Sequence, residues 1–104
     1  MITDIERARE ILISEYKPDK IILFGSHARG DPRPDSDIDL LVICDREKDV
    51  PRPKRGLDVM QKLGVIHTPM DLLFYSSDEF AKYQSVRQSF NATVVREGIL
   101  LYGQ

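Results

Sequence analysis

Residues 21–44 read IILFGSHARGDPRPDSDIDLLVIC. An apolar run ends at the pair Gly25 and Ser26, and a polar loop then leads into a second apolar run that carries Asp37 and Asp39. Alternate residues of a strand share a face, which places the two aspartate Cα atoms roughly 6.6 Å apart. Two carboxylates this close repel each other unless cations lie between them. The stretch therefore predicts a combined metal and phosphate site.

The Gly-Ser pair supplies the phosphate half of this prediction. A glycine at a strand end allows a ligand to approach the backbone closely, and the hydroxyl of Ser26 can donate to a phosphate oxygen. Arg29 follows three residues later and lies on the same side if residues 26–29 form a helical turn. Alone, this signal is weak, because such turns are common between a strand and a helix.

A third acid comes from a later segment. Residues 70–74, MDLLF, are expected to form a strand that opens with Asp71. Together with Asp37 and Asp39 it would make a cluster of three carboxylates that can hold two hard cations through oxygen ligands. Two ions about 4 Å apart can activate an attacking oxygen and stabilise a leaving phosphate. The simpler alternative, a solvated acid at a strand start, applies to Asp71 more than to the other two.

The hydrophobic periodicity predicts alternating helices and strands around these segments. A first helix is expected over residues 4–16, opened by the capping box of Thr3 and Glu6, and strands over 21–24 and 37–44. The 21–24 strand is apolar throughout, as expected for a strand that is buried on both faces. A second helix should begin near Pro53 and end at Gly64, with Leu57, Met60 and Leu63 as its apolar stripe.

The C-terminal part continues the alternation. A long helix is expected between Ser76 and Gly98, because Ser76 and Glu79 have capping-box spacing. Its apolar side would consist of Phe80, Tyr83, Val86, Phe90 and Val94. Residues 99–102 should form an edge strand. The pattern predicts one domain over residues 1–104, of the α/β (α+β) class, with a small mixed sheet flanked by helices.

Composition limits the classes of function. The chain has 104 residues, a formal net charge of −2 and no apolar run long enough to span a membrane, so cytoplasmic residence and no strong binding to nucleic acid are expected. Five basic residues gather in a short segment that we interpret mainly as a solvated linker and first helical turn: Arg46, Lys48, Arg52, Lys54 and Arg55. The single cysteine, Cys44, is expected to be a buried small hydrophobe. We expect His27 to be simply exposed and give His67 no ligand role.

The motif resembles a known family. Gly25-Ser26, ten intervening residues and Asp37-Ile38-Asp39 match the G-S-x10-D-x-D signature of the polymerase-beta-like nucleotidyltransferases. The longer form, GSHARG followed by SDIDLLV, resembles the minimal (MNT-domain) members. The resemblance implies ATP as substrate and Mg²⁺ as cofactor. It also implies that Gly25 and Ser26 hold the triphosphate, with Arg29 as a further contact.

The resemblance also implies roles for the acids and a partner. Asp37 and Asp39 would bind the metal ions, and Asp71 would be the third acid, which helps to deprotonate the acceptor hydroxyl. Small MNT proteins resemble antitoxins that pair with HEPN-domain toxins and transfer AMP to a toxin tyrosine. Two alternatives stay open: a non-catalytic binding module that inhibits its partner by occlusion, and nucleotidyl transfer to a small molecule or an RNA end, which would require a homo-oligomer to build the acceptor groove.

Overall fold

The computed structural model describes residues 3–82, 86 and 89–103. Within these residues a single mixed sheet has the strand order β3-β2-β1-β4. Its strands are β1 (Lys20–Phe24), β2 (Ile38–Ile43), β3 (Met70–Tyr75) and β4 (Ile99–Tyr102). Strand β1 is antiparallel to both β2 and β4, whereas β2 and β3 are parallel. The expected small mixed sheet is therefore confirmed, with β4 at one edge and β3 at the other.

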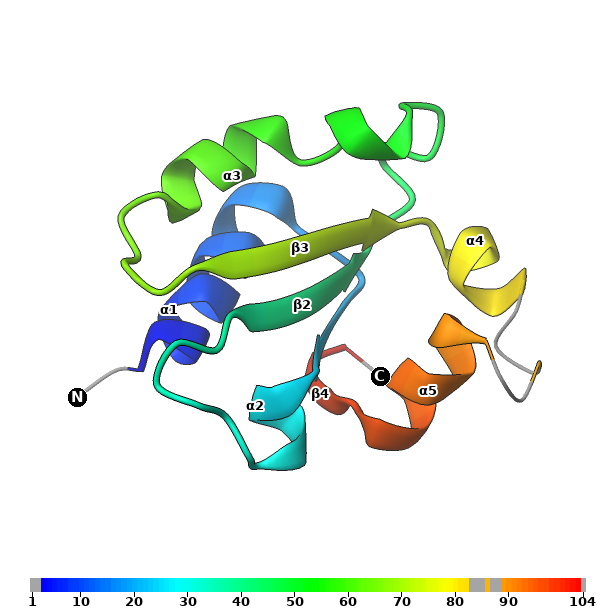
Figure 1. The fold of residues 1–104 in the computed structure, drawn as a ribbon. Helices are drawn as coiled ribbons and strands as arrows, with labels where there is room; N and C mark the ends of the chain where they lie inside the picture. Colours follow the sequence, from blue (N-terminus) through cyan, green and yellow to red (C-terminus); the bar gives the residue numbers. More distant parts are fainter. Residues whose placement is uncertain (1–2, 83–85, 87–88, 104) are drawn as a thin grey trace.

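Helices lie on both faces of this sheet. They are α1 (Asp4–Ile11), which continues into the π-helical turn η1 (Leu12–Tyr16), α2 (Ser26–Arg29), the 3-10 turn η2 (Arg52–Lys54), α3 (Leu57–Leu63), α4 (Ser77–Lys82) and α5 (Phe90–Glu97). Figure 1 shows α1 and α3 on one face and α4 and α5 on the other, while α2 follows directly from the end of β1. The expected α/β class is confirmed.

The two faces of the sheet are covered unequally. On the α1/α3 face, Leu12 and Leu63 pack against Leu40 and Val42 of β2 in the larger cluster of buried residues. On the opposite face, the buried cluster is much smaller and consists of Leu41, Ile43, Phe80 and Val94. Because strand residues alternate between faces, Asp39 shares the thinly covered face with Leu41. The α4/α5 face is thus the one that remains accessible beside the acid.

The first helix agrees with its prediction, and the first strand agrees in part. The Glu6 amide donates to Thr3 Oγ1 at 3.1 Å, which caps α1. The helix ends in the π turn, after which Lys17 adopts a left-handed conformation. In β1, Ile21 and Leu23 are buried but Ile22 and Phe24 are only partly buried, so the expectation of burial on both faces holds for one face.

Helix α3 differs from its prediction. Leu57 and Met60 are 54% and 45% exposed, whereas Val59 and Leu63 are buried. The helix begins at Leu57 after Gly56, and Pro53 belongs to the separate turn η2. The buried face of this seven-residue helix is therefore set by its approach to α1 rather than by the stripe that the sequence suggested. Gly64, expected in a left-handed conformation, is right-handed helical instead.

The prediction of one long C-terminal helix is also wrong. Helix α4 covers Ser77–Lys82 of the described residues, Val86 lies in a bend, and α5 begins anew at Phe90. Ser89 caps this second helix by accepting from the Ala92 amide at 3.1 Å. Of the expected apolar side, Phe80 and Val94 are buried, Val86 and Phe90 are exposed, and Tyr83 lies outside the described residues. The helix does end before Gly98, as expected.

Arg55 is a correction to the solvated-linker interpretation. Its side chain is 3% exposed and donates from Nη1 to Glu79 Oε1 at 2.6 Å and from Nη2 to Glu79 Oε2 at 3.0 Å. It also donates to three backbone carbonyls, those of Val50, Phe74 and Lys48. The sequence groups Arg55 with exposed basic residues, but the fold uses it to tie the 45–55 segment to β3 and α4.

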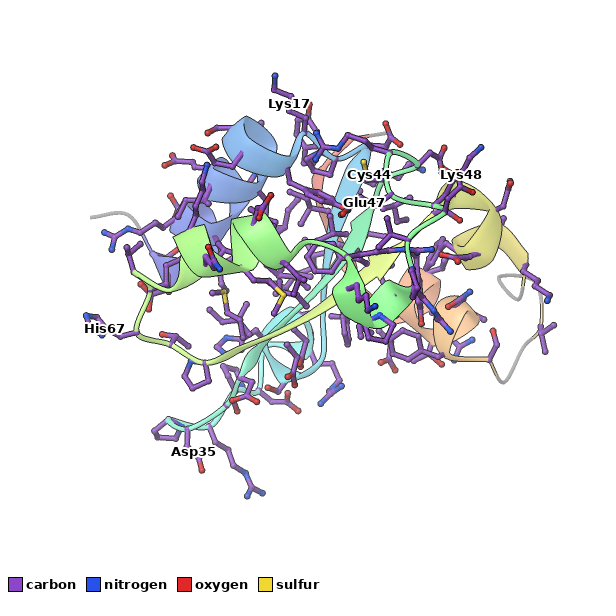
Figure 2. All side chains as sticks on the ribbon, turned by 90° about the horizontal axis from the view of Figure 1, so that it is seen from above. Lys17, Asp35, Cys44, Glu47, Lys48 and His67 are labelled. Carbon is purple, nitrogen blue, oxygen red and sulfur yellow. The ribbon has the colours of Figure 1, made fainter. Side chains whose placement is uncertain are left out.

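Two smaller expectations have clear outcomes. Cys44 is buried, at 6% exposure, as predicted for a small hydrophobe at the end of β2. His67 is exposed, and Figure 2 shows it at the outer edge of the loop before β3. Among the described residues, none of the helices combines the length and apolar character needed to cross a membrane.

Candidate active site

The Gly-Ser turn and the acid strand meet at Gly25. This glycine has φ 76° and ψ −158°, a conformation that is essentially restricted to glycine. A Cβ atom at this position would overlap with the carboxylate of Asp39, specifically with Oδ2. The carboxylate thus lies directly against the turn that begins α2. The structure brings the predicted phosphate-binding turn and one predicted metal ligand into contact.

Asp39 and Asp71 meet across two strands, as the sequence analysis expected for acids from separate segments. They are register partners in the parallel pair of β2 and β3, so their side chains leave the sheet at the same level. Burial raises the pKa of Asp39, and the charge of Asp71, a hydrogen bond shared with Asp71 and the charge of Asp37 raise it further. The nearby His27 opposes this shift. The site therefore holds crowded negative charge.

Asp37 lies less close. It is exposed and immediately precedes β2, whose first amide, that of Ile38, donates to the Pro69 carbonyl at 2.9 Å. Asp37 acts on Asp39 through its charge. Across residues 3–82, 86 and 89–103, no three His, Cys, Asp or Glu side chains are grouped closely enough to hold a metal ion. The structure thus pairs Asp39 with Asp71 and leaves Asp37 beside the pair.

The donor set suits the cation that the family resemblance implies. Paired carboxylate oxygens are the ligands that Mg²⁺ prefers, and a cation between them would relieve the repulsion that raises the Asp39 pKa. Asp39 and Asp71 therefore fit one hard cation. A second ion would need Asp37 to join them, which stays a prediction.

Arg29 lies at the end of α2, on the rim of the site. Its side chain is 49% exposed, and its Nε lies 3.6 Å from Asp31 Oδ1. The expected helical turn over residues 26–29 is confirmed, so Arg29 does follow Ser26 by one turn. A contact between Arg29 and a phosphate stays a prediction.

His27 and two phenylalanines are features that the sequence analysis missed. His27 is half-buried rather than simply exposed, and its Nε2 lies 3.4 Å from the Ser36 carbonyl oxygen. Phe24 is the cross-strand partner of Asp39, and its ring makes an edge contact with Phe90 at 5.4 Å. The available signal was the alternation of side chains along β1, which limits Phe24 to one of the two faces of the sheet.

Comparison with known proteins decides the family. Residues 6–104 match the family described as "Polymerase beta, Nucleotidyltransferase". The chain belongs to this family. The family resemblance drawn from the Gly-Ser and Asp-Ile-Asp spacing is thereby confirmed, and the chain is a nucleotidyltransferase.

Sequence relatives of this nucleotidyltransferase come from Methanocaldococcus jannaschii. One, named a putative protein adenylyltransferase, is 38% identical over 87 residues, which cover 80% of this chain and 77% of the relative. A second protein with the same description is 37% identical over 59 residues, covering 57% of this chain and 58% of the relative.

Solved structures share the fold. The crystal structure of a toxin–antitoxin with AMP-PNP matches with a TM-score of 0.64 at 23% identity, covering 99% of this chain and 75% of that one. A putative nucleotidyltransferase from Sulfolobus solfataricus matches with a TM-score of 0.61 at 22% identity, covering 95% and 76%. At these identities the likeness shows the fold, which agrees with the sheet order and helix placement described above.

Proposed function

We propose that this nucleotidyltransferase transfers AMP from ATP to a hydroxyl of a partner protein, with Mg²⁺ as cofactor. The observation that carries the proposal is the pairing of Asp39 with Asp71 against the Gly25 turn. The relatives named as putative protein adenylyltransferases support AMP as the transferred group and protein as the acceptor. The structural neighbour with AMP-PNP supports an adenine nucleotide as the donor.

The chain's own residues have distinct parts in this reaction. Gly25 and Ser26 hold the triphosphate at the end of β1, and Arg29 adds positive charge at the rim. The acceptor hydroxyl oxygen bonds to the α-phosphorus while the bond from that phosphorus to the pyrophosphate oxygen breaks. The hydroxyl proton passes to Asp71, whose exposed position leaves it open to the acceptor. Metal ions held by Asp39, Asp71 and Asp37 would supply charge neutralisation for the phosphates.

We further propose that the acceptor is a tyrosine of a HEPN-type toxin in the cytoplasm, and that the modification silences the toxin. Support comes from the toxin–antitoxin complex among the structural neighbours and from the MNT-like motif. The chain would then act as an antitoxin by chemistry rather than by occlusion. An occluding antitoxin would inhibit its partner without ATP, so the two mechanisms are separable.

The direct experiment combines this protein, the product of the neighbouring gene, Mg²⁺ and ATP labelled at the α-phosphate. We expect the partner to gain the mass of AMP by mass spectrometry and Asp39→Asn to abolish the gain. Asp35→Asn is the matched control, because Figure 2 shows Asp35 at the outer end of the same loop, pointing away from the sheet. Inhibition of the partner by Asp39→Asn, with no transferred label in either form, would contradict the enzymatic proposal and favour occlusion.

A further inference from the structure

The sheet face that carries the acids continues as an apolar strip toward α4 and α5. Along β3, Asp71, Leu73 and Tyr75 alternate onto this face, opposite Asp39, Leu41 and Ile43 of β2. Leu41 is fully buried, and Leu73 and Tyr75 are partly buried against the same small cluster. At about 3.3 Å per residue, Tyr75 lies roughly 13 Å from Asp71 along the strand. The strip thus leads from the charged site to an aromatic side chain.

Phenylalanines form a wall beside this strip. Phe24 is paired with Asp39 across β1 and β2, and its ring contacts the ring of Phe90 edge to face, with an interplanar angle of 86°. Phe90 is the first residue of α5 and is 43% exposed. Part of the Phe90 ring surface is therefore open to solvent. Phe90 therefore presents this ring surface in direct contact with Phe24, the residue that partners Asp39.

A pocket lies where the strip ends. It has a volume of about 420 Å³, and its lining includes Phe90, Tyr75, Arg52 and Asn91. The Arg52 guanidinium lies over the Tyr75 ring, 5.0 Å from its centroid. The Asn91 side chain is held by donation to the Phe80 carbonyl at 2.7 Å, so the wall behind Phe90 is fixed. Aromatic surface with a few polar groups at this volume is typical of a small-molecule site.

Two considerations limit which group can occupy the pocket: its distance from the reacting phosphorus and the chemistry of its ring. An attacking hydroxyl must come within about 3.5 Å of the phosphorus, so an acceptor ring bonded to that oxygen stays beside the acids. The base of the nucleotide is separated from the α-phosphorus by the ribose, so it can reach farther along the strip than an acceptor ring. A planar base stacks well on aromatic side chains, and arginine donors at the rim suit its ring nitrogens.

We infer that the pocket between Phe90 and Tyr75 holds the adenine ring of ATP, with Phe90 as the residue that stacks on it. The inference rests on the proposed function, because it places the base of the nucleotide on which the acids act. It gives the thinly covered sheet face a second role, since the face that leaves Asp39 accessible also selects the base.

The test compares two ligands that share phosphates and differ in the base. Binding of ATP and of inorganic tripolyphosphate, each with Mg²⁺, is measured by calorimetry for the wild type, Phe90→Leu and Phe90→Tyr. Phe90→Leu keeps an apolar contact with Phe24 but removes the ring, and we expect it to weaken ATP binding about tenfold. Tripolyphosphate binding should not change. Phe90→Tyr, which restores a ring, should bind ATP within about threefold of the wild type.

Val95→Ala is the matched control, since Val95 is 49% exposed on the same helix but lies outside this pocket and should leave both affinities unchanged. Equal weakening of both ligands by Phe90→Leu, or weakening of neither, would overturn the inference. So would unchanged ATP binding with a raised KM for the acceptor protein, which would assign the pocket to the acceptor. A wild type that binds neither ligand would instead contradict the proposed function.

Discussion

Strand β3 has opposite electrostatics at its two ends. At its start, Asp71 faces Asp39 with Asp37 nearby, and burial together with these like charges raises the pKa of Asp39. At its other end, the buried Arg55 binds both carboxylate oxygens of Glu79 and lowers the pKa of Glu79 to about 2. One end leaves charge uncompensated and the other compensates it fully. The contrast supports the proposal that the first end binds a ligand, whereas the second end stabilises the fold.

The largest expected effect comes from filling the space against Asp39. Gly25→Ala would add a Cβ that overlaps with the Asp39 carboxylate, and we expect AMP transfer to fall by about a hundredfold or more. Gly30→Ala is the matched control, because Gly30 has a similar φ of 81° but nothing within 4 Å of an added Cβ. Transfer assays on both variants check this. Equal losses in the two would mean that contact with Asp39 is not the cause.

The next largest effect is expected at the far end of β3, where Arg55 and Glu79 compensate each other's charge. Arg55→Ala would leave three backbone carbonyls and Glu79 without their donor, and we expect a loss of about 3 kcal/mol in the free energy of unfolding. Urea denaturation at pH 7 measures it. The neighbouring exposed residue serves as control, with Lys54→Ala expected within about 0.5 kcal/mol of the wild type. A loss below about 1 kcal/mol would show that the network is not stabilising.

The same pair predicts a pH dependence. Because the folded-state pKa of Glu79 is about 2, below its ordinary value of 4.5, its stabilising contribution is present above pH 4.5 and is lost as the pH falls toward 2. Its side chain is 38% exposed, so screening limits the contribution to about 1 kcal/mol.

Urea midpoints of the wild type and Glu79→Gln at pH 7, 5 and 3 test this contribution. We expect the gap between them to be largest at pH 7 and to shrink at pH 3. Glu10→Gln, at an exposed position on α1, should show no gap at any pH. A gap that widens on acidification would contradict the ion pair as its cause.

The smallest effect should have the opposite sign. Asp39→Asn removes a charge from the crowded end, so we expect the protein without divalent ions to be stabilised by up to about 1 kcal/mol, or roughly 4 °C in Tm. Thermal unfolding in EDTA measures it, with Asp35→Asn as the unchanged control. Added Mg²⁺ should raise the Tm of the wild type more than that of Asp39→Asn. A destabilised variant would mean that Asp39 is already compensated.

The sequence predicts the acids at the start of β3 but not the ion pair at its other end. The apolar runs of β1, β2 and β3 predict the strands, and the spacing of Asp37 and Asp39 predicts acids on one face. That Asp71 would be opposite Asp39 needed the parallel register, which no local pattern gives. The burial of Arg55 was not predictable, because its partner Glu79 lies 24 residues away and its sequence neighbours are exposed charges.

The errors on helices have local causes. Ser89 is a good N-cap residue, and its signal for a new start at Phe90 competed with an apolar period that continued across residues 80–94. In α3, both Val59 and Leu57 were available as core residues, and contact with α1 decided between them. Periodicity describes which residues can share a face; packing against a neighbour decides which face is used.

The parallel pairing of β2 and β3 has a consequence for how faithfully the site is assembled. Phe74 is buried on the α1/α3 face in the register that aligns Asp71 with Asp39, and a shift by one residue would turn every β3 side chain to the other face. A molecule mispaired by one residue would remove Phe74 from the larger buried cluster and turn Asp71 toward that face, which would cost stability. The burial that opposes a one-residue slip of β3 therefore also keeps Asp71 on the same face of the sheet as Asp39.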